Sequence, residues 1–270
     1  MLNRESFLLE NTLLFWRTVA IMKSVIKSFT VLEAFSLKKP ELTFTEVVNI
    51  TGLGRTNAHK VLKTLVSLNC LAQGGHGEPY RLGPRLFELG SRYLTQLNLR
   101  RVAMPHLVKL SEVFEYTVYL CIEDKGEALC LERLDGPSPI QVTVLQRGGR
   151  MPLHAGAAPL AILSGMQDER IVHVMRQRGF KRFTEDTVQN IDQLLDKVKQ
   201  IRKQGYSVSW EDVTTGVASY GAPVWDSSGQ VIGAISIGGL ISRFEGKNKD
   251  YFINLVKETA RNISGELGFA

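Results

Sequence analysis

The sequence predicts an α+β protein made of two parts, and three observations support this. Two short helical patterns flank a glycine-rich turn between Thr43 and Leu68. From Ala103 onward, runs that alternate apolar and polar residues are joined by turns rich in Asp and Gly. They are interspersed with amphipathic helices, as in an antiparallel sheet covered by helices. The excess positive charge lies in the first part, because residues 1–100 hold 13 Lys and Arg against 7 Asp and Glu, whereas residues 101–270 hold 20 of each kind.

Length and composition are those of a soluble globular protein. The 270 residues have room for one large domain or two ordinary ones, with 44% hydrophobic and 22% charged residues. Cys70, Cys121 and Cys130 show no Cys-x-x-Cys spacing, so we expect free thiols in a reducing cytoplasm. Residues 1–22 are expected to form an N-terminal extension, whose apolar runs are too short and too charged for a membrane span or a signal peptide.

Three helices are predicted in the first part. The apolar positions of the first helix recur at helical spacing and should complete a three-helix core: Val25, Ile26, Phe29, Leu32 and Phe35. Thr43 and Glu46 have the spacing of a capping box, so the second helix should begin there and end near Gly52. The third helix should run from Arg55 to about Leu68 and bury one side: Ala58, Val61, Leu62, Leu65 and Leu68.

The opposite side of the third helix is polar and cationic. It carries Arg55, Thr56, Asn57, His59, Lys60 and Lys63. Such a face suits a DNA major groove, where Arg and Asn can pair with base edges and Lys with phosphates. The segment from Glu46 to Glu78 contains no acidic residue between its ends, which favours this interpretation over an ordinary solvated face.

A hairpin and a further helix follow. Residues 70–73 and 80–82 flank the glycine-rich stretch 74–79, which predicts the wing of a winged helix-turn-helix covering residues 23–83. Residues 84–99 show apolar spacing typical of a helix and are predicted to form a linker helix. Its apolar face is too large for so small a winged helix to bury, so a second protomer is expected to cover it.

The second part is predicted to alternate strands and helices. Helices are expected at 105–114, 157–163, 168–178, 190–204 and 248–267, and strands at 116–122, 128–133, 140–146, 206–210, 216–225 and 230–237.

Several motifs in the second part resemble those of a known family. Leu153-His154-Ala155 stands before a helix start of small residues, and Gly205 to Ser209, Gly216 to Ser219, Gly221 to Val224 and Gly233 to Ile237 follow in the last strands. This order, over about residues 23–268, is similar to the IclR family of bacterial and archaeal transcription regulators. The resemblance implies a GAF-like domain over residues 100–270 that binds a small effector, often an organic acid. It also implies homodimers or dimers of dimers that bind palindromic operators in double-stranded DNA.

The resemblance also implies an effector pocket. Its positions fall on Ile140, Thr143, Ala157, Ala158, Ser209, Val217, Ser219 and Ser236. Backbone N–H groups at the start of the 157–163 helix and serine hydroxyls would then bind a carboxylate, with apolar walls around it. The chain departs from the family pattern at Pro159-Leu160, where many members have Gly-Lys, at Ser209, often acidic, and at Gly238, often serine.

Other functions fit the sequence less well. His154, Ser219 and Asp226 supply residue types of a hydrolase, but Ser219 lies in a strand-like run without a Gly-x-Ser-x-Gly turn. No catalytic residues, metal site or cofactor are therefore expected. The sequence indicates a cytoplasmic repressor or activator of transcription whose operator affinity responds to a small organic acid, with no membrane partner. The alternative is a ligand-sensing protein whose winged helix contacts protein instead of DNA.

Overall fold

The computed structural model describes residues 22–75, 77–138, 144–246 and 248–269. Contacts divide the chain into two compact units, the first ending at Tyr93 and the second beginning at Leu94. This division falls within α5 (Pro84–Gln96), a helix that contributes residues to both units.

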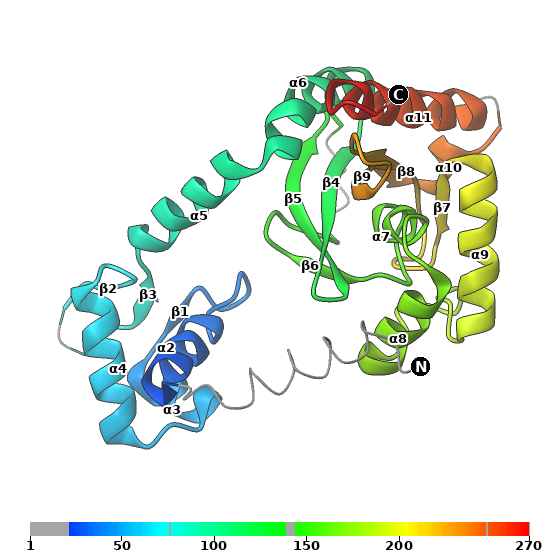
Figure 1. Ribbon diagram of the computed structural model, residues 1–270. Coiled ribbons are helices and arrows are strands. Elements are labelled where there is room, and N and C mark those ends of the chain that lie inside the picture. Colours follow the sequence, from blue (N-terminus) through cyan, green and yellow to red (C-terminus); the bar gives the residue numbers. More distant parts are fainter. Residues whose placement is uncertain (1–21, 76, 139–143, 247, 270) are drawn as a thin grey trace, which may run out of the picture. The chain divides into compact units, whose positions relative to one another are not determined.

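The first unit has the topology of a winged helix-turn-helix (Figure 1). Its described helices are α2 (Lys23–Glu33), α3 (Phe44–Thr51) and α4 (Arg55–Ser67). Its antiparallel strands are ordered β1 (Glu41–Leu42), β3 (Tyr80–Leu82) and β2 (Leu71–Gln73). The predicted helix-turn-helix and hairpin are thus present.

The prediction for the first helix is right in part, because Phe35, just after α2, is buried in the core of the first unit and Leu32 packs against it, whereas the other three predicted residues are exposed. Val31 is completely buried, whereas Val25, Ile26 and Phe29 are 49%, 52% and 59% exposed. Residues 25 and 31 lie about 120° apart around the helix axis, and the core accepts the side that carries Val31. Leu68, expected inside, is 57% exposed because it follows α4 as its C-terminal cap.

The second unit is an antiparallel sheet with helices on both faces, which confirms the predicted α+β class (Figure 1). The sheet order is β6 (Arg150–Pro152), β5 (Glu127–Asp135), β4 (Thr117–Asp124), β9 (Val231–Leu240), β8 (Val217–Trp225) and β7 (Ser207–Trp210).

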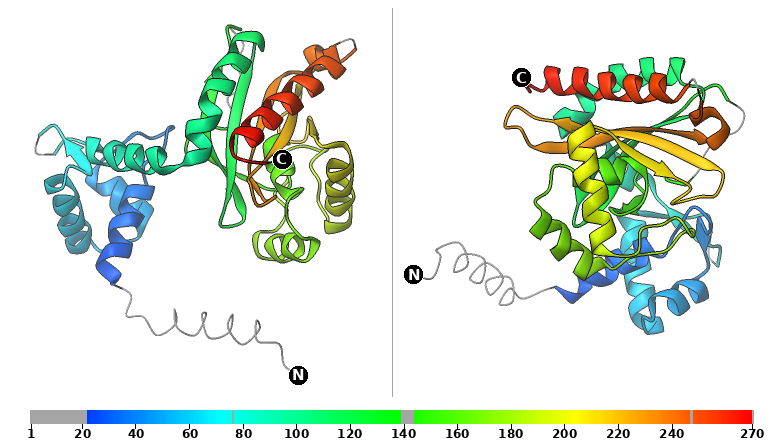
Figure 2. Two further views of the ribbon diagram at one scale, coloured as in Figure 1. Left: turned by 45° about the horizontal axis from the view of Figure 1, so that its top comes forward. Right: turned by 90° about the vertical axis from the view of Figure 1, so that its right-hand side faces the viewer.

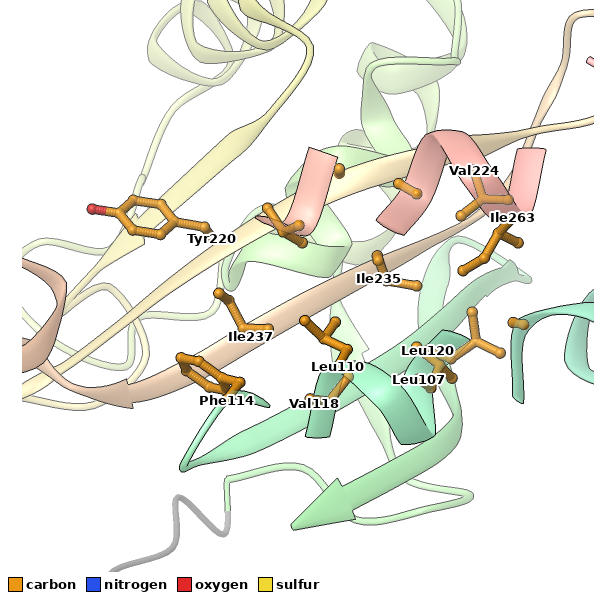
Figure 3. Close-up of a cluster of buried hydrophobic side chains, with 14 of the residues drawn as sticks. Leu107, Leu110, Phe114, Val118, Leu120, Tyr220, Val224, Ile235, Ile237 and Ile263 are labelled. Atoms are coloured by element: carbon orange, nitrogen blue, oxygen red, sulfur yellow. The ribbon is translucent and has the colours of Figure 1, made fainter. Parts of the chain in front are cut away.

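Two helices cover one face of this sheet. They are α6 (Asn98–Val113) and α11 (Asn248–Glu266), which lie side by side in Figure 2. Their apolar residues meet the central strands in the core drawn in Figure 3, where Leu107 and Leu110 of α6 pack with Val118 of β4 and Ile235 of β9. This layer also holds the short helix α10 (Ile241–Phe244), which follows β9.

The other face of the sheet carries α7 (Ala157–Leu163), with α8 (Asp168–Arg178) and α9 (Ile191–Gln204) beyond it. Strand β4 contributes side chains to the cores on both faces of the sheet. Val118 lies in the core under α6 and α11, whereas Tyr119 and Cys121 lie in the core under α7. This alternation follows from the two-residue period of a strand. It brings side chains of the central strands up against the start of α7.

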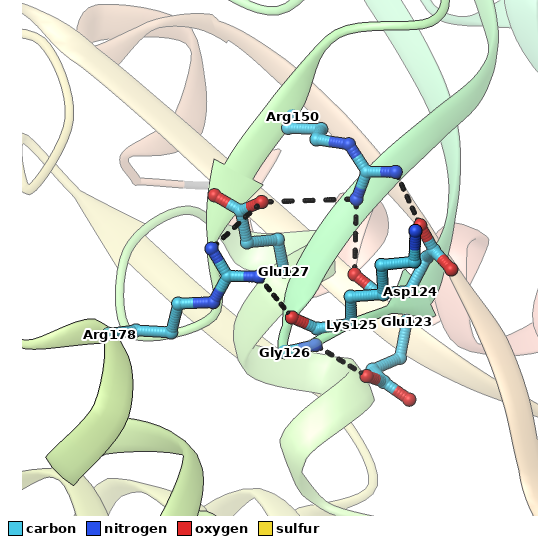
Figure 4. A network of polar contacts seen from close by, with 7 residues as sticks. All are labelled: Glu123, Asp124, Lys125, Gly126, Glu127, Arg150 and Arg178. Carbon is cyan, nitrogen blue, oxygen red and sulfur yellow. Dashed lines mark hydrogen bonds and ion pairs between the residues drawn. The ribbon is translucent and has the colours of Figure 1, made fainter. Parts of the chain in front are cut away.

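An ion-pair network fixes α8 and β6 to the turn between β4 and β5 (Figure 4). Glu127 Oε2 lies 3.9 Å from Arg150 Nη1 and 3.6 Å from Arg178 Nη1. Gly126, at φ 80°, donates its N–H to Glu123 Oε1 at 2.8 Å. Exposed ion pairs contribute little stability, so the network mainly orients α8.

Several elements differ from the prediction. The helix expected from Pro105 begins at Asn98 and contains Pro105, so the predicted linker stretch 84–99 is divided between α5 and α6. Of the strand expected at 140–146, residues 140–143 lie outside the described residues, and 144–146 are not a strand. Within the described ranges, no helix is both long and apolar enough to cross a bilayer.

Candidate DNA-binding face and effector cavity

The start of α3 is fixed by a capping box. Glu46 donates its N–H to Thr43 Oγ1 at 3.3 Å, and Thr43 donates its N–H to Glu46 Oε2 at 2.9 Å. Hydrogen bonds from the Thr43 backbone and hydroxyl, and then from Lys39, lower the pKa of Glu46 from 4.5 to about 2. Gly52 ends the helix at φ 66°, a left-handed conformation that favours glycine. Together these caps define the turn that places α4.

The polar face of α4 is exposed, as the sequence predicted. This face consists of six exposed residues: Arg55, Thr56, Asn57, His59, Lys60 and Lys63. Ala58, Leu62 and Leu65 of the same helix are buried on the opposite side. Within the described residues, neither Lys60 nor Lys63 forms a salt bridge, so both ammonium groups are available to phosphates.

Phe44, at the first position of α3, touches two members of this face. The Arg55 guanidinium carbon lies 5.1 Å from the centroid of the Phe44 ring, a cation–π distance. The His59 ring meets the same ring edge-on, with centroids 6.3 Å apart. Sequence reasoning missed Phe44, although an aromatic residue directly after the helix cap was the visible signal. Phe44 thus links α3 to the orientation of Arg55.

The wing is a short hairpin whose strands pair as expected. Gln73 donates its Nε2–H to the carbonyl of Glu78 at 2.8 Å and closes the loop between β2 and β3. Arg81 Nη1 on β3 lies 3.9 Å from Glu41 Oε1 on β1, the neighbouring strand of the small sheet. His76, in the wing loop, lies outside the described residues.

A cavity lies between the start of α7 and the sheet of the second unit, and we call it the α7 cavity. Its interior is about 70 Å³. The structure brings six predicted effector residues together around it: Ala157, Ala158, Ser209, Val217, Ser219 and Ser236. The other two, Ile140 and Thr143, lie outside the described residues. Pro159 and Gly238, where the chain departs from the family pattern, also line the cavity. Sequence reasoning did not single out the remaining lining residues: Tyr119, Cys121, Val144, Leu145, Met151, Gly156, Val213 and Thr214.

The close approach of α7 to β8 forms one wall of this cavity. Ser207 donates its hydroxyl to the carbonyl of Ala157 at 2.6 Å. A Cβ atom at Gly221 would lie 2.8 Å from that same carbonyl oxygen, so glycine is required at this point of β8. Gly156 precedes α7 at φ 89° and turns the chain into the helix. Small residues therefore allow the helix start to reach the sheet.

The polar groups available in the α7 cavity are hydroxyls. Ser236 is only 4% exposed, yet within the described residues its hydroxyl has no hydrogen-bond partner. Ser219 and Thr214, both half-buried, likewise have no side-chain partner in this part of the chain. Tyr119 stays protonated, because burial raises its pKa to about 12. The described lining is otherwise mostly apolar and contains no Lys, Arg or His.

The buried Asp212 engages Ser209, a lining residue of the cavity, and the N–H group that precedes α7. Gly156 donates its N–H to Asp212 Oδ2 at 3.3 Å, and Ser209 donates its hydroxyl to Asp212 Oδ1. Asp212 is 1% exposed, and this burial raises its pKa. The N–H group preceding α7 is therefore already engaged, and the helix is only seven residues long. The hydroxyls of Ser219 and Ser236 remain as donors for a ligand.

The residue types of a hydrolase do not come together. Ser219 lies near the start of β8 and Asp226 just beyond its end, about 23 Å apart along the strand at 3.3 Å per residue. Asp226 instead accepts hydrogen bonds from Ser228 and Gln230 in its own turn. His154 donates from Nε2 to the carbonyl of Lys181 at 2.9 Å. Within the described ranges, no three His, Cys, Asp or Glu residues are grouped to hold a metal.

Comparisons with known proteins agree with this architecture. Residues 24–75 match the IclR helix-turn-helix domain, and residues 91–265 match the bacterial transcriptional regulator IclR C-terminal domain. The chain is 31% identical to the HTH-type transcriptional regulator KipR of Bacillus subtilis over 92% of its own length and 98% of that protein. It is 30% identical to the HTH-type transcriptional regulator KdgR of Dickeya chrysanthemi over 92% and 81%.

Solved structures show the same fold. The Thermotoga maritima IclR is 25% identical with a TM-score of 0.75, covering 92% of this chain and all of that one. An IclR homologue of Microbacterium hydrocarbonoxydans, solved with 4-hydroxybenzoate, is 25% identical with a TM-score of 0.80, covering 91% and 99%. The family match covers both units and more than half of the residues. The chain therefore belongs to the IclR family, as a DNA-binding regulator of transcription and not an enzyme.

Proposed function

We propose that the chain binds a palindromic operator through its winged helix-turn-helix, and that a small organic acid in the α7 cavity changes this affinity. In this proposal, residues 23–83 bind DNA and residues 100–270 bind the effector. Residues 84–99 link these two domains, and residues 1–22 are an N-terminal extension. The protein acts in the cytoplasm. The observation that carries the proposal is that one chain combines an exposed cationic helix face with a cavity that offers free hydroxyls.

The DNA half of the proposal rests on the polar face of α4. Arg55 and Asn57, in the first turn, have the chemistry to read base edges, and Lys60 and Lys63 that to contact phosphates. A two-fold dimer presents two such faces to half-sites about 34–36 Å apart, so a change in their separation lowers affinity. The effector can shift this balance only through its different affinities for the two arrangements.

The effector half rests on the lining of the α7 cavity. Its interior of about 70 Å³ is several times the 10–15 Å³ that one water needs, so it suits a small molecule. Hydroxyls of Ser219 and Ser236 can donate to a carboxylate, and the apolar lining can hold the body of the ligand. The bound 4-hydroxybenzoate of the Microbacterium homologue supports an acid with an aromatic or similarly apolar body.

Oligomerisation rests on α5. Within the described residues this helix has no buried side chain, and Phe87, Leu89 and Tyr93 are 79%, 47% and 48% exposed. Exposed apolar surface of this kind marks an interaction site. A second protomer supplies the same surface by symmetry, giving a homodimer or a dimer of dimers.

Salt dependence tests the DNA half. An operator is first selected from random duplexes with the full-length protein, and affinity is then measured across salt concentrations. Lys60→Ala and Lys63→Ala should each lower the slope of log K against log salt by about 0.9 for every phosphate that the variant no longer neutralises. Lys203→Ala, an exposed cation on α9, is the control and should leave the slope unchanged. Equal slopes in all variants, or selection of no duplex, would favour protein contacts by the winged helix instead.

A thermal-shift titration tests the effector half. 4-Hydroxybenzoate, benzoate and pyruvate are added to the full-length protein and to the Ser236→Leu variant, whose larger side chain fills the α7 cavity. At least one acid should raise the Tm of the unaltered protein and lose this effect in Ser236→Leu. Ser242→Leu, at an exposed serine of α10, is the matched control. If every acid that raises the Tm of the unaltered protein raises that of Ser236→Leu equally, none of them binds in the α7 cavity and the assignment is contradicted.

A further inference from the structure

A second hollow in the second unit lies between the C-terminal end of α9, strand β8 and α11, and we call it the α11 hollow. Its interior is about 430 Å³, several times that of the α7 cavity, and the two share no lining residue. The hollow exists because β7 begins at Ser207, opposite Gly221. Residues of β8 after Gly221 therefore have no strand beside them on that side, and α9 and α11 flank the opening.

The charged residues of this hollow are all cations. Arg202, Lys257 and Arg261 line it, and its described lining contains no Asp or Glu. Arg202 is already engaged, because its Nη1 donates to Asp168 Oδ1 at 2.7 Å and its Nε to the Ser164 carbonyl at 3.1 Å. The remaining two cations carry the positive potential of the hollow.

Lys257 and Arg261 have donors to spare. Lys257 Nζ donates one hydrogen bond, to the Gln204 carbonyl at 2.9 Å, which leaves two N–H groups. Arg261 has no ion pair or hydrogen-bond partner within the described part of the chain. The two residues are four apart on α11, a spacing at which like charges face each other and destabilise the helix. An anion placed between them removes this repulsion.

The same hollow has an aromatic wall. The Trp225 and Phe269 rings stack with centroids 5.6 Å apart and an angle of 20° between their planes. Trp225 is anchored through its main-chain N–H, which donates to Ser264 Oγ at 2.9 Å. Its indole N–H has no partner among the described residues and is a further free donor. Cationic donors beside an aromatic surface favour a ligand with an anionic group on an apolar ring.

We propose that the α11 hollow is a second ligand site, which binds a small anion made of a carboxylate or phosphate group on an apolar ring. Lys257 and Arg261 bind the anionic group, and the Trp225 wall packs against the ring. The occupant lies at the edge of the sheet, between the end of α9 and α11, which packs against α6. The site is thus separate from the α7 cavity, in which the effector of the proposed function binds.

Isothermal titration of the full-length protein tests the site. The probes are benzoate and phenyl phosphate, which distinguish a carboxylate from a phosphate, and benzylamine, a ring of opposite charge. Lys257→Gln and Arg261→Gln should each weaken anion binding about tenfold, the usual effect of losing a hydrogen bond to a charged group. Lys249→Gln is the control, since Lys249 is an exposed cation of α11 outside the hollow.

The Ser236→Leu variant separates the two sites. Anion binding in the α11 hollow should persist when the α7 cavity is filled, and benzylamine should not bind. Absence of binding by both anions overturns the proposal, as does binding that is unchanged in Arg261→Gln, a variant that leaves the described hydrogen bonds and ion pairs of the folded chain intact. Binding abolished only in Ser236→Leu overturns it too, while supporting the effector role of the α7 cavity.

Discussion

Replacing Phe44 by Leu should weaken operator binding without removing a phosphate contact. Leucine keeps an apolar group at the edge of the first core but removes the ring that lies 5.1 Å from the Arg55 guanidinium carbon. An exposed cation–π contact contributes about 0.5–1 kcal/mol. Ordering a free side chain on binding costs about 0.5–1.5 kcal/mol, which is of the same size.

The expected decrease in affinity follows from the two-fold symmetry of the proposed dimer. Both protomers of a dimer carry the substitution, so the operator complex is weakened by about 1–2 kcal/mol, or roughly 5- to 30-fold in Kd. Phe44→Tyr retains an aromatic face and is the matched control, for which we expect operator affinity near that of the unaltered protein. Circular dichroism melting of each variant shows whether the first core remains intact.

Fluorescence anisotropy against the selected operator and a scrambled duplex provides the assay. The preference for operator over scrambled DNA should fall in Phe44→Leu, while the salt dependence stays constant because the phosphate contacts are retained. Equal or tighter operator binding by Phe44→Leu would refute the reasoning, since it would mean that the ring holds Arg55 away from DNA.

Three further substitutions test the structure by thermal unfolding. Glu46→Gln should lower the Tm at neutral pH. Because the pKa of Glu46 is depressed to about 2, the difference in Tm between the variant and the unaltered protein should vanish as the pH falls from 4.5 toward 2. A difference in Tm that stays constant over this range would contradict the prediction. Gly221→Ala should destabilise the second unit by about 1–3 kcal/mol through its clash with Ala157, whereas Gly265→Ala, with open space around it, should be tolerated. Burial raises the pKa of Asp212, so its stabilising contribution is lost as the pH rises through the folded value. The Tm of Asp212→Asn should therefore rise relative to the unaltered protein as the pH increases from about 4, and a parallel pH profile would count against this.

Local signals in the first part were sufficient to predict its motif. The capping pair Thr43 and Glu46, and Gly52 at the helix end, act within a few residues of themselves, so their spacing specifies the helix boundaries. The first helix was predicted only in part, because Leu32 and Phe35 reach the core but the other three expected residues do not. Tertiary packing selects among the apolar positions that the sequence offers. Val31 fits between α4 and the small sheet, while Phe29 remains 59% exposed.

In the second part, the resemblance indicated residues that the structure brings around one cavity. Residues such as Ala157 and Ser236 are far apart in the sequence, and no periodicity could have joined them without it. Asp212 was missed because its role depends on a contact with Gly156, 56 positions away. Strand β6 was missed because three residues around Met151 are too few to show alternation. Long-range contacts of this kind are not encoded in local patterns.

The absence of any buried side chain within the described α5 has a consequence for how the protein behaves on dilution. A helix of 13 residues is only marginally stable by itself in water. In the proposed dimer its helical state depends on the neighbour that covers Phe87 and Tyr93, so helix formation and assembly become one equilibrium. On dilution below the dissociation constant of the pair, the segment should melt and leave the two units joined by a flexible tether.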